Sequence, residues 1–409
     1  MAKKRDLEGN RLHHFELSDA NRTVRWVLII VLLVVAAVSL TAGLTSALRT
    51  PDGWQTVSGS TTGLNCGDSF ALQYEYGAGE LSATAESKTL QPLYGKALED
   101  AWKLFFNEAG STDLTGLYAL NQQPNQKITV DSGLYAALEQ VVKLESRAIF
   151  LAPVYAEYER VFNSQTESEA REHDPGQNEQ QSAYVQTLAD FAKDPQAIGL
   201  VLDGNNTVTL QVSGDYLTFA ETNEIRYFLD FGWLRNAFIA DYIATILTAN
   251  GFTNGYIASA DGFTRNLSRQ GDVFSLNLFN RDGNDIELAA VMNYTAPQSL
   301  IVLRNYPMYQ SETSRYYSFS DGRILTTMID PADGQSKSAL NNLVSYSEAL
   351  SCAELAMSVM PVYVADTFSE DALNALAQQE IYSVWFSGKQ LMHNEEDLNL
   401  TAYAPYEIK

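Results

Sequence analysis

Histidine and cysteine are scarce in this chain, which has four histidines and two cysteines among 409 residues. His13 and His14 lie in a polar N-terminal segment, whereas His173 and His393 lie in hydrophilic, loop-like surroundings. A Ser-His-Asp or Cys-His nucleophile system would have to use one of the latter two. A zinc site needs Cys and His residues at ligand spacing, and the sequence has no such cluster. The composition therefore disfavours histidine-based catalysis and zinc binding.

Positive charge is also scarce. The chain has 27 Lys and Arg residues against 50 Asp and Glu residues, a formal net charge of -23. Binding to nucleic-acid phosphates requires the opposite sign, so we expect no nucleic-acid partner. With 45% hydrophobic and 19% charged residues, the chain is globular in composition and long enough for two ordinary domains, or for one large domain with appendages.

Charged residues are missing altogether from residues 26–48, an apolar run of about the 20 residues that a helix needs to span a bilayer. Lysine and arginine precede it in residues 1–25, which predicts a cytoplasmic tail and an extracytoplasmic remainder. The run is longer than the apolar core of a cleaved signal peptide, so we expect an uncleaved single-pass anchor in the cell membrane.

Residues 49–69 are rich in Gly, Ser and Thr, which indicates a linker before an extracytoplasmic domain over residues 70–409. Cys66 and Cys352 both fall outside the membrane in this topology, so a disulfide is chemically permitted. Equally, Cys352 can be a small core residue and Cys66 a free thiol. The sequence leaves both alternatives open.

Residues 209–262 form the stretch around which the rest is organised. Short β-rich runs are predicted up to 216–219 and again at 227–231, where the chain reaches Gly232. The apolar period then changes to about three and a half, which predicts a helix that ends at Asn250-Gly251. A strand at 256–258 follows. A strand that passes through glycine into a helix directs backbone N–H groups at one point, an arrangement that suits a phosphate.

The rest of the chain mixes helical and strand periods, which predicts an α+β fold. Helices are expected at 90–106, 130–162, 184–191 and 372–377, and strands at 70–76, 198–202, 274–279, 286–291, 299–303 and 381–386, with a hairpin at 316–323. Residues 163–182 are strongly polar and predict an exposed, mobile loop.

The stretch around Gly232 resembles the signature of the ApbE family, the FAD:protein FMN transferases, which runs Leu-Asp-x-Gly-Gly-Ile-Ala-Lys-Gly-Tyr-x-x-Asp. The matching residues are Leu229, Asp230, Gly232, Leu234, Phe238 and Asp241, and the next strand ends at Ala260-Asp261. The chain departs from the signature at Asn236, which replaces the lysine, at Ala237, which replaces the next glycine, and at Trp233, which replaces a small residue.

Further segments resemble other motifs of this family, in the same order along the chain. Residues 111–121 are similar to Ser-Glu-Leu-Ser-x-Leu-Asn, and Ile329-Asp330-Pro331 is similar to His-His-Ile-Ile-Asp-Pro, with Thr326 and Thr327 in place of the histidines. Residues 345–363 resemble the last motif, Ala-Asp-Ala-Leu-Ser-Thr-Ala on a helix. The resemblance implies a T-fold-related mixed sheet with helices.

The resemblance also implies a cofactor site and a metal site. The residues implied for FAD are Asn121, Asp230, Gly232, Asn236, Asp241, Asp261, Thr327 and Asp330. Glu354 and Ser358 are the implied Mg²⁺ ligands, because residues four apart lie on one helix face and offer two oxygens to a hard cation. The alternative for Glu354 is a capped or salt-bridged helix residue.

Two functions follow from these motifs. The first is a degenerate, weakly active or non-catalytic relative that binds flavin or an envelope protein partner. The second is an active, Mg²⁺-dependent FAD:protein FMN transferase or FAD pyrophosphatase, which in this family moves FMN onto a threonine of a flavoprotein. Losing a positive group from a dry pyrophosphate site costs about 2–4 kcal/mol, and several such losses favour the first function. A surface adhesion domain with an N-terminal anchor is a third alternative.

Overall fold

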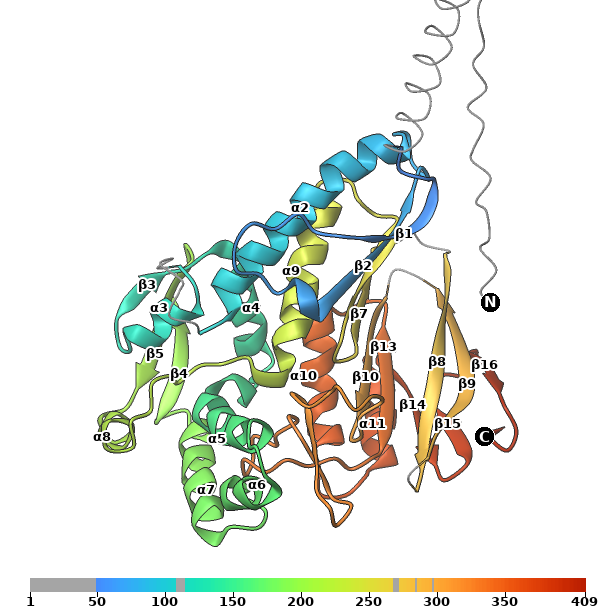
Figure 1. The fold of residues 1–409 in the computed structure, drawn as a ribbon. Coiled ribbons are helices and arrows are strands. Elements are labelled where there is room, and N and C mark those ends of the chain that lie inside the picture. Colours follow the sequence, from blue (N-terminus) through green and yellow to red (C-terminus); the bar gives the residue numbers. More distant parts are fainter. Residues whose placement is uncertain (1–48, 108–114, 268–271, 284, 296–297) are drawn as a thin grey trace, which may run out of the picture. The chain divides into compact units, whose positions relative to one another are not determined.

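A computed structural model describes residues 49–107, 115–267, 272–283, 285–295 and 298–409 (Figure 1). The contacts divide the chain into Met1–Pro51 and Asp52–Lys409, and the following concerns the second unit. The predicted tail and membrane-spanning segment, 1–25 and 26–48, lie outside the described residues. Within the described ranges, no helix combines the length and the apolar character needed to cross a membrane.

A nine-stranded sheet forms the centre of the unit, with strand order β1-β2-β6-β7-β10-β13-β14-β15-β17. Its strands are β1 (Gly53–Val57), β2 (Phe70–Tyr76), β6 (Gly255–Ser259), β7 (Phe263–Asn266), β10 (Ser299–Arg304), β13 (Asn342–Ser347), β14 (Tyr382–Ser387), β15 (Gln390–His393) and β17 (Glu407–Ile408). Neighbouring strands pair in antiparallel fashion except β15 and β17, which are parallel.

Both faces of this sheet are covered. Successive side chains of a strand point to opposite faces, and apolar side chains on each face pack into a separate hydrophobic core. In β10, Ile301 and Leu303 join the larger core, whereas Leu300 packs into the smaller one. Three helices, α2 (Ala83–Phe105), α9 (Arg235–Ala249) and α10 (Cys352–Tyr363), pack on the first face (Figure 1). A three-stranded sheet of β8 (Val273–Asp282), β9 (Asp285–Thr295) and β16 (Asn399–Ala402) covers the second.

A second region lies between α2 and α9 in the chain. A small sheet of β3 (Lys127–Thr129), β5 (Thr207–Val212) and β4 (Ile198–Leu202) is surrounded by short helices. These are α3 (Leu117–Gln122), α4 (Ser132–Lys143), α5 (Ala152–Phe162), α6 (Glu167–His173), α7 (Glu179–Lys193) and α8 (Gly214–Thr222). The hairpin of β11 (Tyr316–Ser318) and β12 (Ile324–Thr326) and the helix α11 (Glu370–Ala377) complete the elements described, together with the 3₁₀ turns η2 (Gly67–Ser69), η3 (Ala148–Leu151) and η4 (Gly232–Leu234).

The predicted mixed α+β class is confirmed, and so are the elements with a strong period. The helix after Gly232 forms as α9 and ends where Gly251 adopts a positive φ of 84°. The strands predicted at 70–76, 198–202 and 299–303 form as β2, β4 and β10.

Two predictions of strands before Gly232 are wrong. Residues 216–219 lie in α8, whose N-terminus is capped by Ser213, because the Ser213 hydroxyl accepts from the Tyr216 N–H. Residues 227–231 form no strand. Three of their N–H groups have partners outside a sheet: the Asn121 side chain accepts from Phe228 and Leu229, and the Ile149 carbonyl accepts from Asp230.

Three further boundaries differ from the prediction. The helix expected over 130–162 breaks into α4, η3 and α5 near Glu145, which has a positive φ of 51°. The loop expected over 163–182 contains α6 and the start of α7, with Thr166 and Asn178 as their N-caps. Part of the expected linker 49–69 forms β1, which pairs with β2. Capping side chains thus created helices in segments without apolar periodicity.

Both cysteines are free and buried, so the disulfide left open by the sequence does not form. The Cys66 thiol contacts the Leu98 carbonyl oxygen and the Cys352 thiol contacts that of Thr264. Burial raises the pKa of Cys66 to about 12 and also raises that of Cys352. Cys352 is therefore the small core residue of the second alternative.

Candidate functional site

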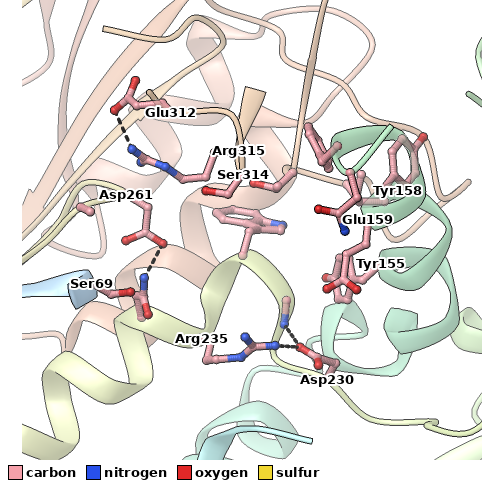
Figure 2. A pocket seen from close by; sticks show the side chains of 18 of the residues that line it. Ser69, Tyr155, Tyr158, Glu159, Asp230, Arg235, Asp261, Glu312, Ser314 and Arg315 are labelled. Carbon is pink, nitrogen blue, oxygen red and sulfur yellow. Dashed lines mark hydrogen bonds and ion pairs between the residues drawn. The ribbon is translucent and has the colours of Figure 1, made fainter. Parts of the chain in front are cut away.

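A cavity of about 860 Å³ opens beside the Gly232 turn, within the size range of ligand pockets. Its walls come from α5, from η4 and the start of α9, from the turn after β6, and from the segment before β11 (Figure 2). The described residues with polar or aromatic side chains in its lining are Asp68, Ser69, Tyr155, Tyr158, Glu159, Phe162, Asn163, Asp230, Trp233, Arg235, Asn236, Asp261, Tyr309, Ser311, Glu312, Ser314, Arg315 and Thr327.

Glycine is required at position 232 for two reasons. Its φ is +54°, in the left-handed region that side chains disfavour. A Cβ atom there would also lie 2.3 Å from two ring carbons of Tyr155, whose hydroxyl donates to the Ala148 carbonyl and holds the ring in place. The close approach of the turn to α5 therefore defines one wall of the cavity.

The Asp230 carboxylate occupies the place that the sequence assigned to a phosphate. Its Oδ1 accepts from the Gly232 N–H at 2.6 Å and from the Arg235 guanidinium at 2.5 Å (Figure 2). Arg235 also lies over the Phe106 ring, 4.4 Å from its centroid. The N–H of Gly232 and the charge of Arg235 are thus both satisfied within the protein.

Asn236, which replaces the family's lysine, donates to Asp261 Oδ2 at 3.0 Å. Asp261 Oδ1 accepts from the Ser259 hydroxyl at 2.5 Å. Desolvation by the cavity wall raises the pKa of Asp261, while these two hydrogen bonds and the charge of Arg315 act in the opposite direction. Asp261 has no ion pair with any described residue.

On a further wall, Glu312 is held between two arginines. Its carboxylate is 2.6 Å from the guanidinium of Arg315 and 2.6 Å from that of Arg304 (Figure 2 shows the first pair). Thr327 lines the same wall, and its backbone N–H donates to the Arg315 carbonyl oxygen. The second arginine of the cavity lining is therefore also neutralised.

The side chains of Glu159 and Trp233 line the cavity without a polar partner among the described residues. Glu159 is exposed to the cavity from α5 and makes no ion pair with a described residue. Desolvation and the charge of Asp230 raise its pKa, and Arg235 lowers it. The Trp233 side chain belongs to a residue only 8% exposed, and its Nε1–H has no hydrogen-bond partner in the described protein.

Asn121, Asp241 and Asp330 lie outside the cavity lining, where each holds the fold together. The Asn121 amide donates to the Leu229 carbonyl and so fixes the segment before Gly232. Asp241 accepts from the backbone N–H groups of Cys352 and Ala353, the first two residues of α10. Asp330 binds the Ala332 N–H and the Lys337 ammonium group.

The two residues implied for Mg²⁺ also lie outside this cavity. Glu354 forms a capping box with Ser351, and its other carboxylate oxygen is 3.0 Å from Lys143 Nζ. Burial raises the pKa of Glu354, but Lys143 and Ser351 outweigh it and lower the pKa overall. Ser358 donates to the Glu354 carbonyl oxygen. Both side chains are engaged within the fold, and this arrangement does not fit a Mg²⁺ site.

Of the sequence-predicted residues, the structure brings together Asp230, Gly232, Asn236, Asp261 and Thr327 in the cavity lining. Sequence reasoning missed the α5 wall and both arginines. A signal for α5 was present, because Tyr155, Tyr158, Glu159 and Phe162 recur at helical spacing and place one carboxylate in an aromatic stripe.

Several solved structures are similar to this chain, and three of them are ApbE proteins from different organisms. The ApbE protein of Thermotoga maritima has a TM-score of 0.56 at 11% identity, covering 81% of this chain and 94% of its own. The flavin transferase ApbE of Vibrio cholerae has a TM-score of 0.52 at 14% identity, covering 87% and 99%. The apo flavinyl transferase ApbE of Pseudomonas stutzeri has a TM-score of 0.50 at 14% identity, covering 86% and 94%.

No family model and no curated protein sequence matches the chain. The structural likeness establishes an ApbE-like fold for the domain, in agreement with the resemblance of the motifs. At these identities the likeness concerns the fold alone. The activity has to be argued from the cavity itself.

Proposed function

We propose that this protein is a membrane-anchored, extracytoplasmic relative of the FAD:protein FMN transferases whose cavity serves binding rather than FMN transfer. One observation carries the proposal. Five carboxylates against two guanidinium groups leave a formal charge of -3 on the described cavity lining, and both guanidinium groups are paired with carboxylates of that lining.

A cavity of this charge disfavours a dinucleotide. FAD brings two phosphate groups, and juxtaposed like charges cost several kcal/mol in a protein interface. A transferase compensates the phosphates with a cation, backbone N–H groups or a positive side chain. Here the Gly232 N–H is bound by Asp230, and Asn236 replaces the lysine. The cavity is large enough for a flavin, but its charge opposes the diphosphate.

Catalysis is tested by FMN release from FAD. The purified full-length protein in detergent is first inspected for flavin absorbance and fluorescence, and then incubated with FAD with and without Mg²⁺. We expect no release above the rate without protein. Mg²⁺-dependent release that is lost in Glu354→Ala would establish the alternative, an active FMN transferase or FAD pyrophosphatase that modifies a threonine of a flavoprotein.

The anchor is tested separately. Residues 26–48 are proposed to hold the domain at the outer face of the cell membrane, with residues 1–25 in the cytoplasm. The buried native thiols leave an added surface cysteine as the reactive one. A Val273→Cys variant, at a position 67% exposed, should react with a membrane-impermeant maleimide on intact cells. Labelling only after cell lysis would contradict the topology.

A further inference from the structure

We propose that the cavity binds a basic protein segment, with a lysine or arginine side chain of that segment between Glu159 and Asp261. This inference rests on the proposed function, because an active transferase would need the same space for FAD. It goes further by naming the chemistry of the occupant.

The first argument is the distribution of unpaired charge. Asp230 and Glu312 have arginine partners, whereas Asp68, Glu159 and Asp261 line the same cavity without an ion pair to any described residue. Figure 2 shows Glu159 on α5 and Asp261 after β6 on opposite sides of the view, with Arg235 and Arg315 turned to their own carboxylates. A positive ligand group therefore meets, from two sides, carboxylates that have no ion pair with a described residue.

The aromatic walls favour an organic cation. Tyr155, Tyr158, Phe162, Trp233 and Tyr309 line the cavity together with these carboxylates. Ammonium and guanidinium groups are attracted to the faces of aromatic rings, and their alkyl stems bury against them.

The buried indole of Trp233 belongs to this aromatic wall. The residue is 8% exposed and lines the cavity, but its Nε1 atom is covered by protein and has no acceptor among the described residues. The ring therefore offers apolar surface to an occupant, and its N–H does not reach one. A lysine or arginine side chain of a peptide suits such a wall, because it joins a cationic group to an alkyl stem.

The carboxylates do not suit a metal ion. Within the described ranges, no group of three or more His, Cys, Asp or Glu side chains lies close enough together to hold one. Ca²⁺ takes six to eight convergent oxygen ligands, and Mg²⁺ demands octahedral geometry. The separated carboxylates of this cavity do not provide the convergent set of oxygens that either ion needs.

The proposed occupant is an extended chain, because a second hollow adjoins the cavity. A second hollow of about 650 Å³ shares Phe162, Asn163, Tyr309 and Glu312 with the first. Its own lining is largely polar and includes Ser164, Gln165 and Thr313. Polar side chains of this kind hydrogen-bond to a peptide backbone. The two hollows together thus accept several residues of a polypeptide.

The test is a calorimetric titration of the full-length protein in detergent with two peptides. One is acetyl-Ala-Ala-Lys-Ala-Ala-amide, and the other has norleucine in place of lysine, which removes the charge and keeps the alkyl chain. We expect saturable binding of the lysine peptide only, weakened by added salt. Glu159→Gln and Asp261→Asn should each lower its affinity about tenfold, the value of one charge-assisted hydrogen bond.

Glu172→Gln is the matched control, because it removes the same charge from an exposed site on α6 away from the cavity. It should leave the affinity unchanged. Equal binding of both peptides, no binding of the lysine peptide at millimolar concentration, or equal losses in Glu159→Gln and Glu172→Gln would overturn the inference.

The two proposals fail in different ways. Mg²⁺-dependent release of FMN refutes the proposed function, whatever the peptides do. Absence of release together with absence of lysine-peptide binding leaves the non-catalytic assignment intact and refutes only the basic segment.

Discussion

Carboxylates gather at two places in this domain, in the cavity beside Gly232 and at the start of α10. At α10, Asp241 accepts two backbone N–H groups, and Glu354 closes a capping box and pairs with Lys143. In the cavity, Glu159 and Asp261 have no ion-pair partner in the described chain. The motif that implied a metal site lies at the start of α10, whereas the carboxylates without an ion pair lie in the cavity.

This contrast shows that a residue of a metal-binding motif can be explained by its structural role alone. An acidic residue in the first turn of a helix is stabilised by the helix N-terminus, whether or not a metal is bound. Glu354 at that position is therefore explained by capping. The carboxylate of Glu159 has no such explanation, because it makes no ion pair with any described residue and Arg235 acts on it only from a distance. The predictions below separate the two kinds of residue.

The largest effect is expected at the Gly232 turn, which builds the cavity. Gly232→Ala forces a side chain into a positive φ and against the Tyr155 ring. Strain and overpacking should together lower the free energy of unfolding by about 3–5 kcal/mol. Urea denaturation followed by tryptophan fluorescence measures the change.

Gly214→Ala is the control for that variant. Gly214 begins α8, has no atom within 4 Å of an added Cβ, and lacks a positive φ. It should be neutral or slightly stabilising, because alanine has the higher helix propensity. Equal losses at positions 214 and 232 would show that the turn has no special role.

A smaller loss is expected at Asn121. This side chain is 3% exposed and accepts from the N–H groups of Phe228 and Leu229. Asn121→Ala leaves two buried donors unpaired and should cost about 2–4 kcal/mol. The same denaturation experiment on Asn223→Ala, whose side chain is exposed and bonds only the Phe219 carbonyl, should give a change near zero. A neutral Asn121→Ala would remove its structural role and favour the flavin role implied by the motif.

The smallest effect is expected at Glu354, and it depends on pH. The folded-state pKa of Glu354 is lowered from 4.5, so its stabilising contribution is present above pH 4.5 and is lost as the pH falls through the folded-state pKa. Glu354→Gln keeps a side-chain oxygen for the capping box and should cost only about 0.5 kcal/mol at neutral pH, the value of a negative charge at a helix N-terminus, because the Lys143 side chain is 71% exposed and its ion pair adds little. The difference between the two proteins should vanish in acid. A difference that grew in acid would contradict this role of the charge.

The sequence predicted those parts of the fold that depend on periodicity, such as α9, β2 and β10. It failed where one side chain decides the local structure. Ser213 turned a predicted strand into α8, and Asn121 bound the N–H groups that a predicted strand at 227–231 needed. The Asn121 contact joins residues 108 positions apart and leaves no local pattern, whereas the Ser213 cap is local and competed with a β-rich composition.

The residues of the candidate site also divide into those that the sequence could place and those that it could not. Asp230, Gly232 and Asn236 lie in or beside one turn, so their neighbourhood followed from the motif. Arg315 and Glu159 reach the cavity from distant elements and could not be placed from their own surroundings. The pairing that neutralises each arginine depends on side-chain geometry, which residue type alone does not determine.

The central claim is that carboxylates without an ion pair make this cavity favour positive ligands and disfavour negative ones. One measurement tests it most directly. The double variant Glu159→Gln and Asp261→Asn is titrated with the lysine peptide and, separately, with FAD in the presence of Mg²⁺. The claim predicts opposite changes, a loss of peptide affinity and a gain of FAD affinity relative to the unmodified protein. A loss of FAD affinity in the double variant would contradict it, because the carboxylates would then serve flavin binding.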